Sequence, residues 1–379
     1  FDAETAYAAI DRHRLDDFKP YVYRTHDGGK TWQSIANGLP ITVNVVREDP
    51  VRKGLLYAGT ERGVSVSFDD GEHWESLQLN LPTTSVRDID VHGNDLVIGT
   101  HGRAFWILDD VTPLRQDIAS APFLFKPAAA VRYRAAGFTG TPTPKDEAMA
   151  SNPPTGAYID YVLDAPAKAV ALEILDEHDS LVRRYSSEDK APAANPAKLT
   201  VAPEWFVTPS TLATTPGMHR FVWPLRLVAP GSTDAYANGI WVPPGNYKAV
   251  LTVDGKRLTE SFAVTADPRI TPYDFAAQFT LAREVSEANA RIDAARTEAE
   301  EVVKKHPNAA ALADIAPAAA WWLPPASTST LRYLDQATQK LLNVLDNADA
   351  PPSIDARESW SKLKPLVDDA LRKWEEFKR

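Results

Sequence analysis

The sequence predicts a mainly β protein with a helical C-terminus, built from a partial β-propeller, an immunoglobulin-like β-sandwich and a three-helix bundle. Three observations lead to this fold class. Residues 1–115 repeat with a period of about forty residues and several short β-rich runs per repeat. Residues 157–267 contain about seven strand-like runs. After Thr271 the apolar residues recur at helical spacing. We therefore expect domains at residues 1–121, 122–270 and 271–379.

Composition narrows the classes of function. With 379 residues the chain is expected to hold two or three domains of ordinary globular character. A net charge of −10 argues against a nucleic-acid partner, which requires a basic surface. There is no cysteine, and the eight histidines show no metal-binding spacing, so we expect no metal or cofactor. No apolar run reaches the roughly eighteen residues of a membrane helix.

The repeats of residues 1–115 are seen by aligning them on one another. Gly59-Thr60 falls on Gly99-Thr100, and Asp69-Asp70 falls on Asp109-Asp110. Two full repeats and a partial one are present, whereas a closed propeller has at least about four blades. We therefore expect the missing blades to come from the same precursor or from another chain. Because the chain begins at Phe1 without a signal segment, we also expect it to be a piece of a longer protein. The expected strands are Val43–Val46, Leu55–Ala58, Val64–Ser67, Val86–Val91, Leu96–Ile98 and Ala104–Leu108.

A motif of the form Ser/Thr-x-Asp-x-Gly-x-Thr/His-Trp occurs twice. Its Asp is suited to accept hydrogen bonds from the backbone of its own turn, and its Gly to supply a positive φ. The Trp is suited to bury its ring against the hairpin base. We expect these roles to be structural, the alternative being a repeated binding surface. The motif residues are Thr25, Asp27, Gly29 and Trp32 in the first copy, and Ser67, Asp69, Gly71 and Trp74 in the second. The third repeat has lost most of the motif: Ile107, Asp109 and Val111 stand where Ser, Asp and Gly are expected.

This motif resembles the Asp-box, or BNR repeat, of sialidases, two-propeller xyloglucan hydrolases and the sortilin ectodomain. Together with "HGRAFWILDD" (His101–Asp110), residues 1–115 resemble large exported bacterial proteins described as glycosyl hydrolase-like or sortilin-like. The resemblance implies that the boxes lie at the blade periphery, away from the central channel. It also implies a secreted or periplasmic location.

Candidate ligand-facing residues are expected on the inner hairpin of a repeat, where a blade faces the central channel. In "THGRAFW" these are His101, Arg103 and Trp106, and one repeat earlier they are Glu61 and Arg62. The structural alternative is a closing hairpin whose Arg pairs with a neighbouring Asp and whose Trp fills a gap between blades. His13 and Arg14, in the long first loop, are weaker candidates.

The middle segment has the features of a β-sandwich. Asp254-Gly255 between two alternating runs is typical of a two-residue hairpin turn, and another hairpin is expected near Asp176–Ser180. Trp223 and Trp241 are expected in the core. The stretch "GMHRFVWPLR" followed by "WVPPGNYKAVLTVDG" is similar to the immunoglobulin-like domain of flagellar hook-capping proteins, with Pro224 where an Asp is common.

The C-terminal segment has three helical seams. The first helix is expected to open at Thr271-Pro272 and to end at His306-Pro307. The third is expected to be interrupted at Pro365. Trp321-Trp322 could be an exposed aromatic platform, the alternative being an anchor on the bundle. The apolar positions are Leu281, Val285, Ala288, Ile292, Ala295, Ala299 and Val302 on the first helix, Leu331, Leu334, Leu341 and Leu345 on the second, and Trp360, Leu363, Val367, Ala370, Trp374 and Phe377 on the third.

Two functions fit the sequence. The first is a non-catalytic C-terminal part of an exported propeller protein, whose intact propeller binds a glycan or a protein. The second is a glycoside hydrolase whose active site is completed by blades outside this chain. A glycosidase needs two carboxylates about 5 to 10 Å apart, and the 51 acidic residues offer no pair that the sequence singles out. The catalytic residues therefore stay unassigned.

Overall fold

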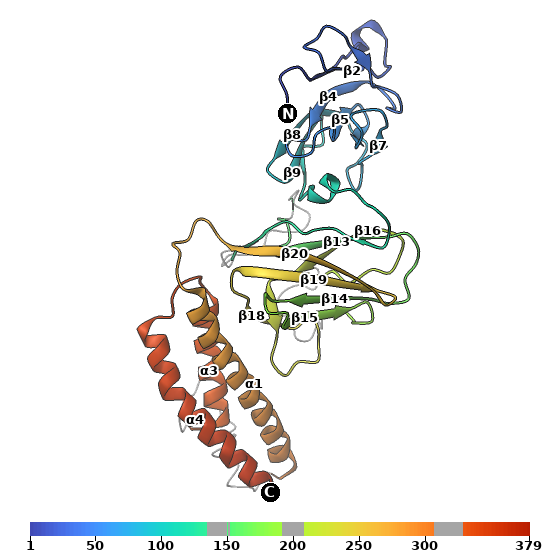
Figure 1. Cartoon of the computed structure of the whole chain (residues 1–379). Helices are drawn as coiled ribbons and strands as arrows, with labels where there is room; N and C mark the ends of the chain where they lie inside the picture. Colours follow the sequence, from blue (N-terminus) through green and yellow to red (C-terminus); the bar gives the residue numbers. More distant parts are fainter. Residues whose placement is uncertain (135–149, 151, 192–207, 307–328) are drawn as a thin grey trace. The chain divides into compact units, whose positions relative to one another are not determined.

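The computed structural model describes residues 1–134, 150, 152–191, 208–306 and 329–379 (Figure 1). The chain forms two compact units, residues 1–119 (unit 1) and residues 120–379 (unit 2). Unit 1 consists of β-sheets, and unit 2 contains further β-sheets followed by helices. The predicted fold class is confirmed. The division of unit 2 into separate sandwich and bundle domains stays a prediction.

Unit 1 consists of three antiparallel sheets, which we call blades A, B and C. The strand that begins blade B, β4, lies against the strand that begins blade C, β8, and these are the inner strands of the two blades. Among the described residues, only blade B has four strands. Blade A contains β1 (Ala6–Ala9), β2 (Val22–Thr25) and β3 (Gln33–Ser34); blade B contains β4 (Val43–Glu48), β5 (Leu56–Thr60), β6 (Gly63–Ser67) and β7 (Glu75–Ser76); blade C contains β8 (Val86–His92), β9 (Asp95–Thr100) and β10 (Phe105–Leu108).

The cores of unit 1 lie between neighbouring blades. The two faces of blade B are both buried, because Leu56 and Ala58 pack toward blade A while Tyr57 and Val64 pack toward blade C. Successive residues of a strand point to opposite faces of its sheet, so β5 serves both cores. Each blade therefore depends on its neighbours for burial of apolar surface, as expected of repeat architectures.

The chain leaves blade C through a short segment that is bound to blade B. After β10 it turns at Asp110 and forms the 3-10 helix η2 (Thr112–Arg115). Arg115 Nε donates to both carboxylate oxygens of Asp49 at 3.0 Å, and the Asp49 side chain is fully buried. Arg52 of blade B donates to the Leu114 carbonyl at 3.0 Å and to the Asp117 carboxylate at 2.6 Å. We call residues 109–119 the exit segment.

Unit 2 begins with a two-layered β structure. A three-stranded sheet has the order β11-β13-β16, and a five-stranded sheet has the order β12-β20-β19-β14-β15. The small pair β17-β18 lies beside β15. The strands are β11 (Phe123–Leu124), β12 (Ala130–Arg132), β13 (Ala157–Leu163), β14 (Val170–Leu175), β15 (Leu181–Ser186), β16 (Gly217–Trp223), β17 (Arg226–Val228), β18 (Asn238–Trp241), β19 (Gly245–Val253) and β20 (Lys256–Ala266).

Both predicted hairpins of the sandwich are present. Asp254 and Gly255 join β19 to β20 with φ of 48° and 90°, the left-handed conformation that two-residue hairpin turns require. Trp223 is fully buried in the sandwich core. Trp241 is partly buried and packs against the same core, so the prediction of a core position holds only in part for Trp241. Its ring also lies where the sandwich meets the helices, beside Arg134 and Arg226.

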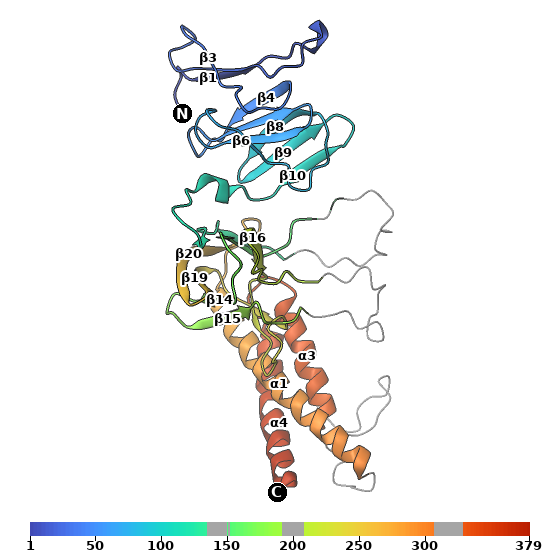
Figure 2. The same cartoon turned by 90° about the vertical axis from the view of Figure 1, so that its right-hand side faces the viewer.

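The described C-terminal residues form three helices, α1 (Phe275–Lys305), α3 (Leu331–Asp346) and α4 (Ile354–Lys378), which run side by side in Figure 2. The predicted opening at Thr271-Pro272 is wrong: Asp274 caps α1 by accepting from the N–H groups of Ala276 and Ala277. The predicted interruption at Pro365 is also wrong, because α4 continues through it. Pro365 is exposed, so water can bind the carbonyl that loses its N–H partner. Trp321-Trp322 lies outside the described residues.

The helices are held to the sandwich by arginines and one aromatic ring. The Arg226 guanidinium lies 4.4 Å from the Trp241 ring centroid, and that of Arg134 lies 5.2 Å from it. The connection between α3 and α4 supplies the counter-charges, since Asp349 pairs with Arg132 at 3.0 Å and with Arg134. We call these five residues the junction cluster.

Candidate functional site

The first Asp-box satisfies its own polar groups. The Asp27 carboxylate accepts from the Thr25 hydroxyl at 2.8 Å, and from the Thr31 N–H at 2.9 Å and hydroxyl at 2.7 Å. The Thr25 hydroxyl oxygen accepts from the Gly29 N–H at 3.0 Å. The backbone N–H of Thr31, together with these hydroxyls, lowers the pKa of Asp27 to about 2. The carboxylate thus orders its own turn.

The second Asp-box repeats this geometry with one change. Asp69 accepts from the Ser67 hydroxyl at 2.9 Å and from the His73 N–H at 2.9 Å, and Gly71 donates to Ser67 at 2.8 Å. His73 replaces the Thr of the first box, and its Nδ1 lies 2.6 Å from Asp69 Oδ2. This hydrogen bond raises the pKa of His73.

The Trp residues of the two boxes differ in their surroundings. Trp74 packs against the core between blades A and B, and its Nε1 donates to the Ile35 carbonyl of blade A at 2.7 Å. Trp32 is 47% exposed. The expectation that both rings bury under their hairpins therefore fails at Trp32. The Trp74 ring is covered by blade A, which precedes its own blade in the chain, whereas Trp32 belongs to blade A itself.

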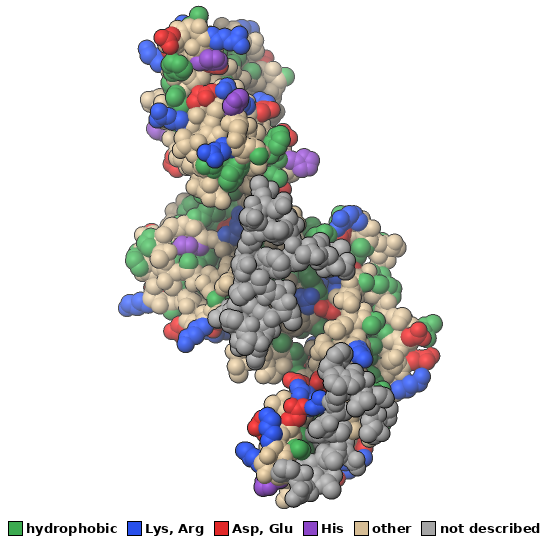
Figure 3. Space-filling model, turned by 180° about the vertical axis from the view of Figure 1, so that it is seen from behind, with side chains coloured by type: hydrophobic (Ala, Val, Ile, Leu, Met, Phe, Trp, Pro, Cys, Tyr) green, Lys and Arg blue, Asp and Glu red, His purple; other side chains and the backbone are tan. Residues whose placement is uncertain are grey.

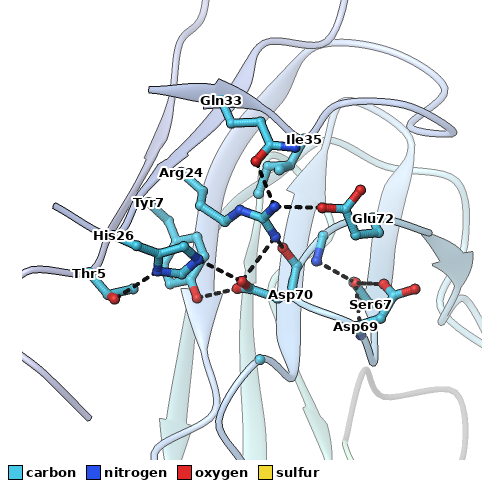
Figure 4. A network of polar contacts seen from close by, with 12 residues as sticks. Thr5, Tyr7, Arg24, His26, Gln33, Ile35, Ser67, Asp69, Asp70 and Glu72 are labelled. Atoms are coloured by element: carbon cyan, nitrogen blue, oxygen red, sulfur yellow. Dashed lines mark hydrogen bonds and ion pairs between the residues drawn. The ribbon is translucent and has the colours of Figure 1, made fainter. Parts of the chain in front are cut away.

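A polar network joins blade A to blade B beside the second box (Figure 4). The buried Arg24 guanidinium donates to the Asp70 carboxylate at 2.9 Å and to its carbonyl at 2.6 Å, and it contacts Glu72 at 2.5 Å. Tyr7 donates to Asp70 at 2.5 Å, and His26 Nε2 lies 2.9 Å from the same carboxylate. Burial raises the pKa of Tyr7, and the hydrogen bond to Asp70 adds to the effect. The first box has Gly28 at the position of Asp70, so only the second box makes this connection.

The candidate ligand-facing residue Glu61 lies in a polar cluster between blades B and C. Its carboxylate accepts from Asn44 at 3.0 Å and pairs with Arg87 at 3.2 Å. Arg87 also donates to the Asn44 amide oxygen at 3.3 Å, and Asn44 donates to the Val86 carbonyl at 3.0 Å. Because Asn44 and Glu61 come from blade B and Arg87 from blade C, the cluster spans the blade interface. We call these three residues the polar cluster.

Matching irregularities in the two inner strands position the polar cluster. The pairing of β4 with β5 shifts between Val43 and Val45, and that of β8 with β9 shifts between Val86 and Asp88. A β-bulge of this kind redirects the side chain it contains. Asn44 and Arg87 occupy the bulges, so both polar side chains leave the apolar interface. Sequence reasoning missed these two residues; the broken alternation in Val43-Asn44-Val45-Val46 is the signal that could have found Asn44.

The other candidates lie on the hairpins at the same end of the inner strands. Glu61 donates its N–H to the Thr42 carbonyl at 3.1 Å, and His101 donates to the Ser85 carbonyl at 2.8 Å, so the two hairpins are held alike. His101, Arg103 and Arg62 are exposed. Trp106 has a structural role, because it packs against the core between blades B and C and its Nε1 donates to the Arg103 carbonyl at 2.9 Å. The structure therefore groups Trp106 with the core.

The long first loop also carries charge at this end. Asp11 falls at the position of Glu61 when β1 and β5 are aligned through their box-containing partner strands. Asp11 Oδ2 lies 2.5 Å from His13 Nδ1. The pKa of Asp11 is lowered by the backbone N–H of His13, and the charge of Arg87 contributes. Among the described residues, no group of three or more His, Cys, Asp or Glu side chains is arranged to hold a metal ion.

Comparison with known proteins gives partial likenesses. No family model matches the chain. An 81-residue stretch is 31% identical to the vacuolar protein sorting/targeting protein 10 of Pyrenophora teres f. teres (strain 0-1) and covers 21% of this chain. The match spans 5% of that relative's length. In the part of the chain that the structure describes, no helix is long and apolar enough to cross a membrane.

Two solved structures show low overall similarity. PorZ, a bacterial surface component of the type-IX secretion system of Porphyromonas gingivalis, aligns with a TM-score of 0.24 and 12% identity, over 69% of this chain and 37% of its own. YCF48, solved bound to the D1 peptide, aligns with a TM-score of 0.19 and 20% identity, over 24% of this chain and 30% of its own. At these TM-scores the two likenesses support no argument about the fold or the ligand of this chain.

Proposed function

We propose that the chain is a non-catalytic part of an exported propeller protein, whose intact propeller binds a glycan or a protein ligand at the end that carries the polar cluster. The observation that supports this most directly is that the Arg87 side chain is both exposed and held in place by its neighbours. Its side chain is 46% exposed, while Glu61 and Asn44 of the neighbouring blade hold one edge of the guanidinium. A guanidinium oriented in this way presents its remaining N–H groups to a ligand at little cost in conformational entropy.

The charges around the polar cluster suggest the chemistry of the ligand. Arg62, Arg103 and His101 are exposed on hairpins at the same end of the blades. Arginine recognises carboxylates and other oxyanions through paired hydrogen bonds. We therefore expect the ligand to present acidic groups, either as an acidic glycan or as an acidic protein surface. Further blades, from the same precursor or from another chain, would complete the binding face.

The carboxylates of unit 1 favour binding over hydrolysis. Asp27 and Asp69 are hydrogen-bonded within their own turns, and Glu61 is bonded to Arg87 and Asn44. A glycosidase acid or nucleophile must instead face the substrate across the bond to be cleaved. A glycoside hydrolase would need its catalytic carboxylates from blades outside this chain, and it remains the alternative.

Binding of the full chain to an array of acidic and neutral glycans and acidic peptides tests this proposal. Arg87→Ala is expected to weaken binding by at least about tenfold, the loss of one charge-assisted contact. Arg257→Ala, which removes an Arg with a 60% exposed side chain from the sandwich, is the matched control and should leave binding unchanged. Binding that does not respond to Arg87→Ala would contradict the assignment of the site. Hydrolysis of a polysaccharide by the chain would contradict the non-catalytic role.

The proposed location is outside the cytoplasm, secreted or periplasmic. It is supported by the resemblance of the Asp-box repeats to those of exported proteins. Fractionation of cells that express the natural gene, with immunodetection of this chain, tests it. Recovery in the cytoplasmic fraction would overturn this part of the proposal.

A further inference from the structure

In the part of the chain that the structure describes, blade C has no counterpart of the outer strand found in the other two blades. Strand β10 pairs with β9 and, among the described residues, with no other strand. The corresponding strands of blades A and B each have a second partner, since β2 pairs with β3 and β6 pairs with β7. Position 105 of β10 corresponds to position 64 of β6, because Phe105 pairs with Gly99 as Val64 pairs with Gly59. This register places Leu108, and not Ile107, at the position of Ser67, so the predicted alignment of the third repeat with the Asp-box is wrong by one residue.

The two outer strands that are present share one sequence pattern. Both follow directly on the Trp of an Asp-box, as Trp-Gln-Ser-Ile in residues 32–35 and Trp-Glu-Ser-Leu in residues 74–77. The Ile35 N–H donates to the Val22 carbonyl at 2.9 Å, and the Leu77 N–H donates to the Val64 carbonyl at 2.9 Å. Ile35 is buried between blades, and Leu77 packs against the next interface. In blades A and B the outer strand therefore lies in a segment of the type Trp-Gln/Glu-Ser-Ile/Leu.

Among the described residues, no strand pairs with the outer edge of β10. Its four residues, Phe-Trp-Ile-Leu, include no charge and no proline. Phe105 is 81% exposed and Ile107 is 59% exposed. They lie on the face of blade C that corresponds to the face of Val64 and Val66, which in blade B packs toward the next blade, so their exposure concerns this face and not the edge. Figure 3 shows hydrophobic side chains at the surface of unit 1. Exposed sheet edges are normally guarded by charges, prolines or a covering segment, so an apolar open edge indicates a missing partner.

The chain does not supply this strand from the segment that follows β10. After β10 the chain forms the 3-10 helix η2 in place of an outer strand, and the buried Arg115–Asp49 pair holds the exit segment on blade B. The Trp-Gln/Glu-Ser-Ile/Leu pattern occurs at only two places in the sequence, and both are already used in blades A and B. A second copy of the chain therefore has no free segment of this kind to offer.

We propose that the edge of β10 binds a fourth strand from outside residues 1–119, a segment of the Trp-Gln/Glu-Ser-Ile/Leu type added antiparallel to β10. By equivalence with Val22 and Val64, the Phe105 carbonyl accepts the N–H of its Ile or Leu. This is strand addition to an exposed edge, in which backbone hydrogen bonds give affinity and alternate side chains give specificity. The inference rests on the fold and not on the ligand proposed for the polar cluster.

A synthetic peptide with the sequence of residues 67–78 serves as the probe, because this segment fills the equivalent edge of blade B. Hydrogen exchange of the full chain is measured with and without about 1 mM peptide, a concentration suited to a weak backbone interaction. We expect exchange in residues 105–108 to slow by about tenfold or more. The control peptide carries Leu77→Pro and lacks the N–H that bonds to Val64, so it should give no protection.

Three outcomes decide the proposal. Protection of β10 by the native peptide alone supports it. No protection, or equal protection by both peptides, overturns it. Protection of β10 without peptide that rises with protein concentration, together with a dimer in sedimentation, would show that a second copy covers the edge, and this also overturns it. The Arg87→Ala variant is expected to bind the peptide normally, which separates this test from that of the proposed ligand site.

Discussion

The two Asp-box glycines allow a matched test of how blades pack. Gly29 and Gly71 occupy the same box position with φ of 85° and 91°, a conformation that other residues adopt only with strain. A Cβ on Gly71 would lie 2.6 Å from Ile35 Cδ1 of blade A, and 3.0 Å from its Cβ. A Cβ on Gly29 would meet only the Trp32 ring, at 3.7 Å. An alanine at either site therefore has the same unfavourable positive φ, but only at position 71 does its Cβ collide with a neighbouring side chain.

The expected free energies of unfolding follow from this difference. Gly29→Ala should lower the stability of unit 1 by about 1 kcal/mol, the cost of the positive φ alone. Gly71→Ala should lower it by about 2–4 kcal/mol, because displacement of the packed Ile35 adds the cost of overpacking. Urea unfolding of the full chain, followed by hydrogen exchange of segments in unit 1, measures both. Equal losses in the two variants would refute the claim that the second box is clamped between blades.

Three further predictions concern other contacts. Arg115→Ala leaves the buried Asp49 carboxylate without its ion-pair partner and should destabilise unit 1 by about 3–5 kcal/mol. An unchanged urea midpoint would contradict the role of the exit segment. His73 has a raised pKa, so its contribution to stability is complete below the ordinary His value and is lost as pH rises through the raised value. His73→Thr, which copies the first box, should flatten this pH dependence above the ordinary His pKa of about 6.5. A slope that persists in the variant would assign the pH dependence to another group. Trp241→Ala removes the ring between Arg134 and Arg226 and should speed hydrogen exchange at the α3–α4 connection while the helices stay folded; unchanged exchange there would show that the ring does not hold the junction cluster.

Local chemistry made the boxes predictable from sequence. The hydrogen bonds of Asp27 and Asp69 join residues at most four positions apart, so the motif itself contains the information for its turn. The Asp254-Gly255 hairpin is predictable for the same reason. The opening of α1 was predicted at the wrong residue, because Thr271 and Asp274 are both of capping type and only the structure shows that Asp274 caps the helix.

Contacts between blades were not predictable in this way. The same Trp of the motif is exposed at position 32 and packed at position 74, because the difference lies in a neighbouring blade and not in the motif. The polar cluster joins residues 44, 61 and 87, and two of them owe their orientation to bulges that a single sequence shows only as a break in alternation. The sequence therefore suggested candidate residues on the hairpins, but it did not suggest Asn44, the inner-strand residue that orients Arg87.

The exit segment has a mechanical consequence. Tension applied to the chain between the two units reaches Arg115 and Arg52 before it reaches β10. Arg115 binds the buried Asp49 carboxylate of blade B, and Arg52 of blade B binds the exit segment, so the load is shared by several hydrogen bonds that must break together. Strand β10, held to β9 alone among the described strands, would otherwise be peeled away one bond at a time. When unit 2 is pulled, the contacts of the exit segment therefore bear the force before it reaches β10 at the open edge of blade C.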